Sequence, residues 1–210
     1  MGSYGHSTDN HRAQDPEELE KGTFETDRET RALKILAPTW DAIYEIAMSL
    51  APKVLRDVPF DTIVGVSRGG LITARIFSDL LAVKDVIIIH SQHYQGVDVL
   101  EDVKVGKIEL PDLSKRSVLV TDDIADTGES LKKISELLIP KIHRLKTLCL
   151  FKKNLSTFTP DFYQNETNAW IIFPWERFEA IKALEGKGVS TTDIIEAGID
   201  ESILHRLKSF

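Results

Sequence analysis

The sequence predicts an α/β protein with a doubly wound parallel sheet. Short apolar runs typical of buried strands occur at residues 62–66, 86–89, 118–121 and 145–151. Segments with helical periodicity lie between several of these runs, and polar or glycine-rich loops follow two of them. Strands that alternate with helices favour a parallel sheet covered by helices on both faces.

Length and composition indicate one ordinary globular domain. The chain has 210 residues, of which 42% are hydrophobic and 28% charged, enough to bury a core. A net charge of -7 argues against nucleic acid as the main partner. No apolar run approaches the roughly 20 residues of a membrane span, and no signal peptide is visible. We therefore expect a cytoplasmic protein, and the single cysteine, Cys149, is expected to be a buried strand residue.

The predicted elements follow one another from a polar N-terminal tail. Residues 1–25 are polar and are predicted to be disordered. The main domain is assigned to residues 26–176, and residues 177–210 are expected to form a helical C-terminal extension. Residues 91–114 suggest a small hood, either a hairpin or a mobile flap. The first helix is expected to start near Pro38, with apolar residues at helical spacing: Trp40, Ile43, Tyr44, Ala47, Leu50 and Ala51.

The segment from Val118 to Ser130 carries most of the functional signal. An apolar run leads into the adjacent carboxylates Asp122 and Asp123, and a loop of small, hydroxyl and glycine residues follows before a helix-like segment at 131–139. Backbone N–H groups and the helix dipole at such a loop favour a phosphate. The carboxylates, at the C-terminal edge of their strand, need a different partner, either ribose hydroxyls or a hydrated Mg²⁺ carried by the substrate. One loop therefore indicates a sugar, a phosphate and a metal ion.

Three other interpretations explain this segment less well. Asp126 or Thr127 would serve as a helix N-cap, but capping needs one such residue and not three acids. The triplet Asp126-Thr127-Gly128 also occurs in aspartic proteases, which are all-β proteins, whereas a helix-period segment follows here. The glycine spacing fits neither the P-loop nor the dinucleotide-binding fingerprint.

A second loop, residues 67–70, follows the strand at 62–66 in the same way. Gly69 and Gly70 allow close approach of the backbone to a ligand, and the planar cation of Arg68 suits phosphate oxygens. Taken alone, a plain strand–helix turn with a surface arginine explains this loop equally well. Together, the two loops suit a sugar with phosphate groups at both ends.

Residues 120–130 resemble the signature of type I phosphoribosyltransferases, which bind 5-phosphoribosyl-1-pyrophosphate (PRPP). Three further segments resemble the xanthine-guanine (6-oxopurine) enzymes of that family. Residues 39–41 open the first helix as in those enzymes, residues 66–71 look like their pyrophosphate loop, and residues 170–176 look like the segment that holds the base. The resemblance spans residues 38–176.

The resemblance implies a role for the residues of both loops. Asp122 and Asp123 would bind the ribose 2′- and 3′-hydroxyls near a Mg²⁺ ion held through PRPP, and Asp126 would act at purine N7 as the general acid or base. The expected 5′-phosphate cradle consists of Ala125, Thr127, Gly128, Glu129 and Ser130. The expected pyrophosphate site consists of Arg68, Gly69 and Gly70.

The base site is also implied by the resemblance. Lys153 would donate to purine O6 and select 6-oxo over 6-amino bases, with Lys152 as the alternative. Trp170 would stack on the purine, while the Ile171 backbone and Glu176 would lie near the 2-position. Trp170 and Trp175 would also suit a hydrophobic core.

The implied function is purine salvage. The enzyme would move the 5-phosphoribosyl group from PRPP to N9 of guanine, xanthine or hypoxanthine, with Mg²⁺ as cofactor, and would work as a homodimer or homotetramer. A PRPP- or nucleotide-sensing regulator on the same fold is one alternative, against which the net charge of -7 argues. A phosphoribosyltransferase for adenine, orotate or uracil is another, against which Lys153 and Trp170 argue.

Overall fold

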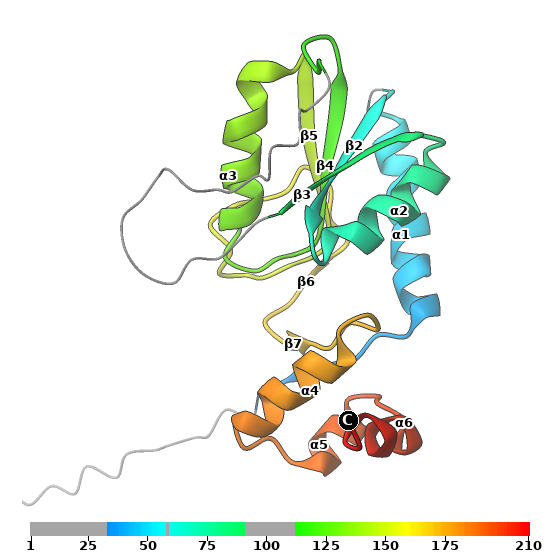
Figure 1. Cartoon of the computed structure of the whole chain (residues 1–210), viewed down its shortest axis with the longest axis vertical. Coiled ribbons are helices and arrows are strands. Elements are labelled where there is room, and N and C mark those ends of the chain that lie inside the picture. The colour runs from blue at the N-terminus through cyan, green and yellow to red at the C-terminus, as the bar shows by residue number, and fades with distance from the viewer. Residues whose placement is uncertain (1–32, 58, 91–111) are drawn as a thin grey trace, which may run out of the picture. The chain divides into compact units, whose positions relative to one another are not determined.

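The computed structural model describes residues 33–57, 59–90 and 112–210 (Figure 1). A five-stranded sheet has the order β3-β2-β4-β5-β6, and all of its pairings are parallel. Its strands are β2 (Thr62–Ser67), β3 (Asp85–His90), β4 (Ser117–Ala125), β5 (Arg144–Lys152) and β6 (Asn165–Glu166). The predicted α/β fold with a parallel sheet is confirmed. The expected tail and residues 91–111 of the expected flap lie outside the described residues.

Helices cover both faces of this sheet (Figure 1). The helices α1 (Trp40–Leu55) and α2 (Gly70–Leu80) pack on one face, and α3 (Glu129–Leu138), followed by the short 3₁₀ helix η2 (Ile139–Lys141), packs on the other. Because neighbouring strand residues point to opposite faces, each central strand supplies both cores. The core beneath α1 and α2 includes Ile43, Leu50, Ile63, Phe77, Leu119 and Leu148. The core beneath α3 includes Val64, Val66, Val118, Val120, Leu131 and Leu138.

A smaller core joins the C-terminal residues to the start of the described chain. The strands β1 (Ile35–Leu36) and β7 (Trp170–Ile171) pair in parallel, and α4 (Arg177–Gly186), α5 (Thr191–Glu196) and α6 (Glu201–Leu207) follow. Ala37 donates its N–H to the Ala197 carbonyl at 3.2 Å. This third core includes Ala37, Ile172, Ala180, Ile181, Leu184 and Leu204.

Several boundaries differ from those expected. The first helix begins at Trp40, because the Thr39 hydroxyl accepts a hydrogen bond from Ala42 N (3.1 Å) and caps it, so Pro38 precedes the cap. Trp40 and Tyr44 are 51% and 41% exposed, although their spacing matches that of the buried residues. Residues 177–210, expected to be helical, contain the helices α4, α5 and α6. Among the described residues, no helix is long and apolar enough to cross a membrane.

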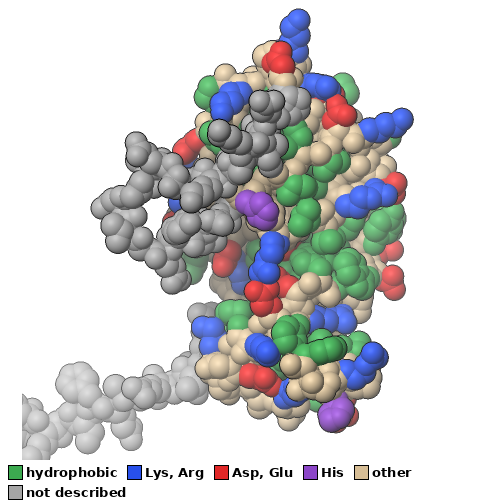
Figure 2. Space-filling model, viewed as in Figure 1, with side chains coloured by type: hydrophobic (Ala, Val, Ile, Leu, Met, Phe, Trp, Pro, Cys, Tyr) green, Lys and Arg blue, Asp and Glu red, His purple; other side chains and the backbone are tan. Residues whose placement is uncertain are grey.

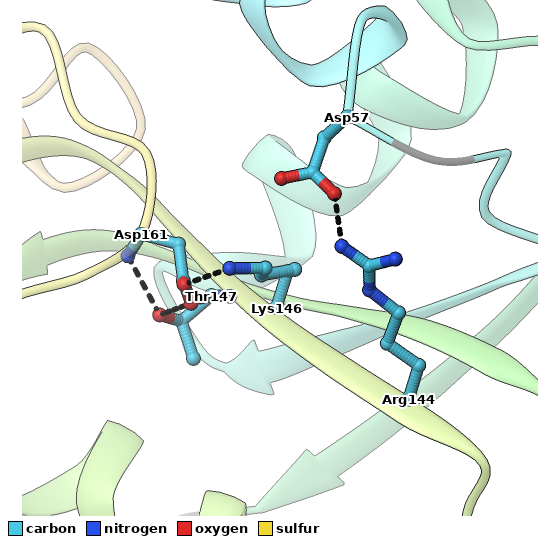
Figure 3. Close-up of polar contacts among 5 residues, drawn as sticks. All are labelled: Asp57, Arg144, Lys146, Thr147 and Asp161. Carbon is cyan, nitrogen blue, oxygen red and sulfur yellow. Dashed lines mark hydrogen bonds and ion pairs between the residues drawn. The ribbon is translucent and has the colours of Figure 1, made fainter.

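Polar contacts hold the segment after β5 against that strand (Figure 3). Asp161 accepts hydrogen bonds from the backbone N (2.8 Å) and hydroxyl (2.9 Å) of the buried Thr147, and from Lys146 Nζ (2.7 Å). Nearby, Arg144 forms an ion pair with Asp57 at 2.5 Å, which ties the start of β5 to the end of α1. These contacts hold the first half of the strand that leads to Lys153.

We expect Asp161→Ala to lower the free energy of unfolding by about 1–3 kcal/mol, because it leaves two buried donors of Thr147 unpaired. Urea unfolding measures this change. Asp79→Ala is the control, because it removes only an exposed pair with Arg75 at 3.9 Å and should have little effect. Equal losses in the two variants would contradict this role of Asp161.

Candidate active site

The candidate site lies where strands β2 and β4 separate. Residues Thr62 to Gly65 of β2 pair with Val118 to Thr121 of β4, whereas β4 continues beyond Thr121 alongside β5. The strand order reverses between β2 and β4, because β3 lies on the far side of β2. In open α/β sheets, ligands bind at such a point, beyond the carboxyl ends of the strands.

A cavity of about 450 Å³ opens at this point. It brings together Arg68 from the loop after β2 and the acidic loop at the end of β4. The strand β4 runs on to Ala125, so both adjacent carboxylates are strand residues and not loop residues. The expected site residues that line this cavity are Arg68, Asp122, Asp123, Ala125, Asp126, Thr127, Gly128 and Ser130.

The adjacent carboxyl groups of Asp122 and Asp123 both have raised pKa values. Burial raises the pKa of Asp122 well above its ordinary value, and the charge of Asp123 adds to this effect. Burial also raises the pKa of Asp123, against the hydrogen bonds that Trp175 Nε1 (3.3 Å) and Ile124 N (2.8 Å) donate to its carboxylate. A bound cation or hydroxyl donors would favour the ionised forms of both groups.

Gly69 and Gly70, the glycines of the second loop, are not among the residues that line the cavity. They lie against strand β4 instead. A side-chain carbon on Gly69 would overlap the Asp123 carboxylate, and one on Gly70 would overlap the Thr121 carbonyl oxygen. These positions therefore allow the first turn of α2 to pack directly on β4. This packing is a second reason for glycine, besides the close approach to a ligand that the sequence suggested.

The loop at the end of β4 presents the start of helix α3 to the cavity. Gly128 precedes this helix with a φ of 83°, a left-handed conformation that favours glycine, and offers no side chain as a cap. The Thr127 hydroxyl accepts from Glu129 N at 3.3 Å, and the Thr127 carbonyl accepts from Thr157 N at 3.0 Å. The Glu129 side chain lies toward Lys133 (3.8 Å), and Glu129, which was expected at this site, is not among the residues that line the cavity.

A second cavity, of about 340 Å³, adjoins the first. Its walls include the four residues expected at a base site: Lys153, Trp170, Ile171 and Glu176. Burial lowers the pKa of Lys153, against the charge of Asp126, and Lys153 Nζ donates to the Ala169 carbonyl oxygen. The alternative lysine, Lys152, is buried and donates to Glu166 at 3.1 Å.

Three residues line both cavities: Arg68, Ile124 and Asp126. A ligand in the first cavity and a ligand in the second would therefore meet at Asp126. Close by, burial raises the pKa of Glu176 to about 7, with a further contribution from the charge of Asp123. The Arg68 guanidinium donates to both carboxylate oxygens of Glu179, at 2.9 and 2.8 Å.

The structure adds residues that the sequence did not single out. His90 ends strand β3 and lines the first cavity. Its position at the C-terminal end of a parallel strand was the available signal. Glu179, Ala180 and Ala183 of α4 line the second cavity, and no motif marked them. Trp175 stacks on Phe173 (4.7 Å between ring centroids) and donates to Asp123, so it combines packing with support of the carboxylate pair.

Charged side chains on the face drawn in Figure 2 are mixed in sign. Lysine and arginine alternate with aspartate and glutamate over the described residues visible there, without an extended basic area. Strong nucleic-acid binding usually needs such an area.

Comparisons with known proteins agree with this geometry. A family model described as a phosphoribosyl transferase domain matches residues 39–178. This match covers more than half of the chain, so the chain belongs to the phosphoribosyltransferase family and is an enzyme of that class. The predictions of fold, family and enzyme class are confirmed.

Individual relatives are named xanthine-guanine or purine phosphoribosyltransferases. A xanthine-guanine phosphoribosyltransferase of Idiomarina loihiensis is 27% identical over 143 residues, which is 66% of this chain and 84% of that protein. One of Gluconobacter oxydans is 28% identical over 142 residues, covering 66% and 82%. Among solved structures, a purine phosphoribosyltransferase from Pyrococcus horikoshii Ot3 has a TM-score of 0.58 at 29% identity, over 68% of this chain and 94% of that one.

We expect Asp122→Asn to raise the free energy of unfolding of the ligand-free protein by roughly 0.5–2 kcal/mol at pH 8, the usual range of single stabilising substitutions. The folded-state pKa of Asp122 is raised, so the wild type loses stability as the pH rises above the unfolded value of about 3.9. The stability advantage of Asp122→Asn over the wild type should be smaller at pH 5, because the wild type has lost less stability there than at pH 8. Urea unfolding at both pH values measures it, and a variant less stable than the wild type at pH 8 would contradict the expectation.

Proposed function

We propose that this enzyme transfers the 5-phosphoribosyl group of PRPP to N9 of a 6-oxopurine, releasing a nucleoside 5′-monophosphate and pyrophosphate. The observation that carries the proposal is the junction of the two cavities at Asp126, Arg68 and Ile124. One cavity has the acids and helix start that suit a ribose phosphate, and the other has an aromatic ring and a lysine that suit a purine.

PRPP occupies the first cavity in this proposal. The amides and hydroxyls from Ala125 to Ser130 bind its 5′-phosphate, Asp122 and Asp123 bind the ribose hydroxyls, and Arg68 binds the pyrophosphate. Its 5′-phosphate is held where the helix dipole of α3 favours an anion. Arg68 then stabilises the charge that leaves with the pyrophosphate.

Mg²⁺ fits this arrangement as an ion carried by the substrate. Asp122 and Asp123 offer the hard oxygen ligands that Mg²⁺ prefers. Among the described residues, no group of three or more histidine, cysteine, aspartate or glutamate side chains is placed to hold a metal. We therefore assign the ion to PRPP, beside these two carboxylates. When bound, Mg²⁺ would supply positive charge that stabilises the pyrophosphate.

The purine lies in the second cavity, stacked on Trp170. Lys153 Nζ donates to O6, and its lowered pKa reflects a partly buried position suited to such a contact. A 6-amino group offers a donor in place of that acceptor, which disfavours adenine.

Bond formation at C1′ then needs one proton transfer. The bond from C1′ to the pyrophosphate oxygen breaks, the pyrophosphate keeps the electron pair, and purine N9 forms the new bond to C1′. The proton on N7 becomes acidic as N9 is alkylated, and Asp126 accepts it. Holding both reactants in adjoining cavities supplies the positioning on which such a transfer depends.

The direct test is pyrophosphate release from Mg·PRPP with guanine, xanthine, hypoxanthine, adenine and uracil. We expect release with the 6-oxopurines, and Asp126→Asn should lower the rate by about 10²–10⁴ because it removes the proton acceptor. Asp79→Asn, on the exposed face of α2, is the matched control. Better use of adenine, or an unimpaired Asp126 variant, would contradict the proposal.

The ionisation of Glu176 should make base preference depend on pH. Its pKa of about 7 means that the carboxylate form dominates above pH 7 and the acid form below. The carboxylate accepts a charge-assisted hydrogen bond from the 2-amino group of guanine, which hypoxanthine lacks. The ratio of kcat/KM for guanine to that for hypoxanthine should therefore rise up to about tenfold from pH 6 to pH 8. Glu176→Gln should flatten the profile, and the same rise in that variant would remove Glu176 from the explanation.

A further inference from the structure

Helix α4 forms a wall of the base cavity although most of it lies outside the family match. The match ends at residue 178, whereas Glu179, Ala180 and Ala183 line the second cavity. The helix is held there by the third core, to which Ala180 also belongs. Farther along the chain, Lys187 Nζ lies 5.5 Å from the ring centroid of Trp170. The C-terminal residues are therefore part of the site.

Glu179 holds the arginine of the pyrophosphate loop. Both of its carboxylate oxygens accept from the same nitrogen, Arg68 Nη2, at 2.9 and 2.8 Å. The pair is open to solvent, with side chains 74% and 62% exposed. The second carboxylate near Arg68, Glu176, also acts electrostatically on both Glu179 and Arg68. In the described structure, the charge of Arg68 is thus already matched by an internal anion.

We propose that Glu179 acts through Arg68 as an internal substitute for the pyrophosphate group and lowers the affinity of the site for that group. This inference rests on the proposed function, because it needs Arg68 to bind pyrophosphate. Arg68 exchanges partners: it binds Glu179 when the site is empty and the pyrophosphate when PRPP or the product is bound.

Competition between Glu179 and pyrophosphate for the Arg68 guanidinium explains why Glu179 should lower the affinity for pyrophosphate. Pyrophosphate oxygens that reach Arg68 must displace Glu179 or share the guanidinium with it. The Glu179 carboxylate remains nearby and repels the anion. A ligand that must first break an internal contact binds more weakly by the cost of breaking it. Because exposed ion pairs are weak, we expect an effect of about two- to fivefold. Release of the product pyrophosphate is favoured by the same factor.

Calorimetry of the full chain with Mg·pyrophosphate tests the proposal. Glu179→Gln removes the charge and keeps the size of the side chain. Glu196→Gln, an exposed position on α5, is the matched control for charge in the same extension. Both substitutions are also made in an Arg68→Ala background, where the effect of Glu179 should vanish if it acts through Arg68. Inhibition of the reaction by pyrophosphate gives a second reading, in which kcat and KM for PRPP are separated.

The expected result is two- to fivefold tighter pyrophosphate binding in Glu179→Gln, no change in Glu196→Gln, and no added effect of Glu179→Gln in the Arg68→Ala background. Unchanged or weaker binding in Glu179→Gln would overturn the proposal. Equal tightening with and without Arg68 would also overturn it, since Glu179 would then act only as a diffuse charge. Failure of the wild type to bind Mg·pyrophosphate or Mg·PRPP would instead refute the proposed function.

Discussion

The site depends on two adjacent carboxylates that the sheet buries where one of its strands loses a neighbour. Asp122 and Asp123 follow the residues that pair with β2, and the continued pairing with β5 keeps them in an extended strand. Their raised pKa values record the cost of this burial. Neighbouring features follow from the same constraint: Gly69 leaves space for the Asp123 carboxylate, and Trp175 donates to it.

The two cavities are joined by the residues between these carboxylates and helix α3. Asp126 comes after the end of β4, and Gly128 turns the chain into the helix with a positive φ. Lys153 reaches the base cavity because it follows β5, the neighbour of β4 in the sheet, and its backbone N donates to the Ala125 carbonyl at 3.0 Å. In the proposed function, neighbouring parallel strands would therefore position the sugar phosphate and the base, and Asp126 would lie within reach of both as the proton acceptor.

Much of this arrangement was predictable from local sequence. Apolar runs of strand length marked the sheet, and the acids at residues 122, 123 and 126 marked the site, because their chemistry is local to one loop. The resemblance favoured Lys153 over Lys152, but strand periodicity alone could not decide between them, because adjacent residues of an extended chain point to opposite faces. Glu179 was also missed, because its partner Arg68 lies 111 residues away and no motif links the two. His90 could have been predicted at the site only if the position of β3 beside β2 had been known.

In the proposed function, binding of PRPP with Mg²⁺ favours the ionised forms of the buried Asp122–Asp123 pair, whose pKa values burial raises. Calorimetry of Mg·PRPP binding at pH 7, in buffers with different ionisation enthalpies, measures the protons exchanged. We expect the wild type to release more protons on binding than Asp122→Asn does. Tight binding without proton release, or with equal release by the two proteins, would contradict it.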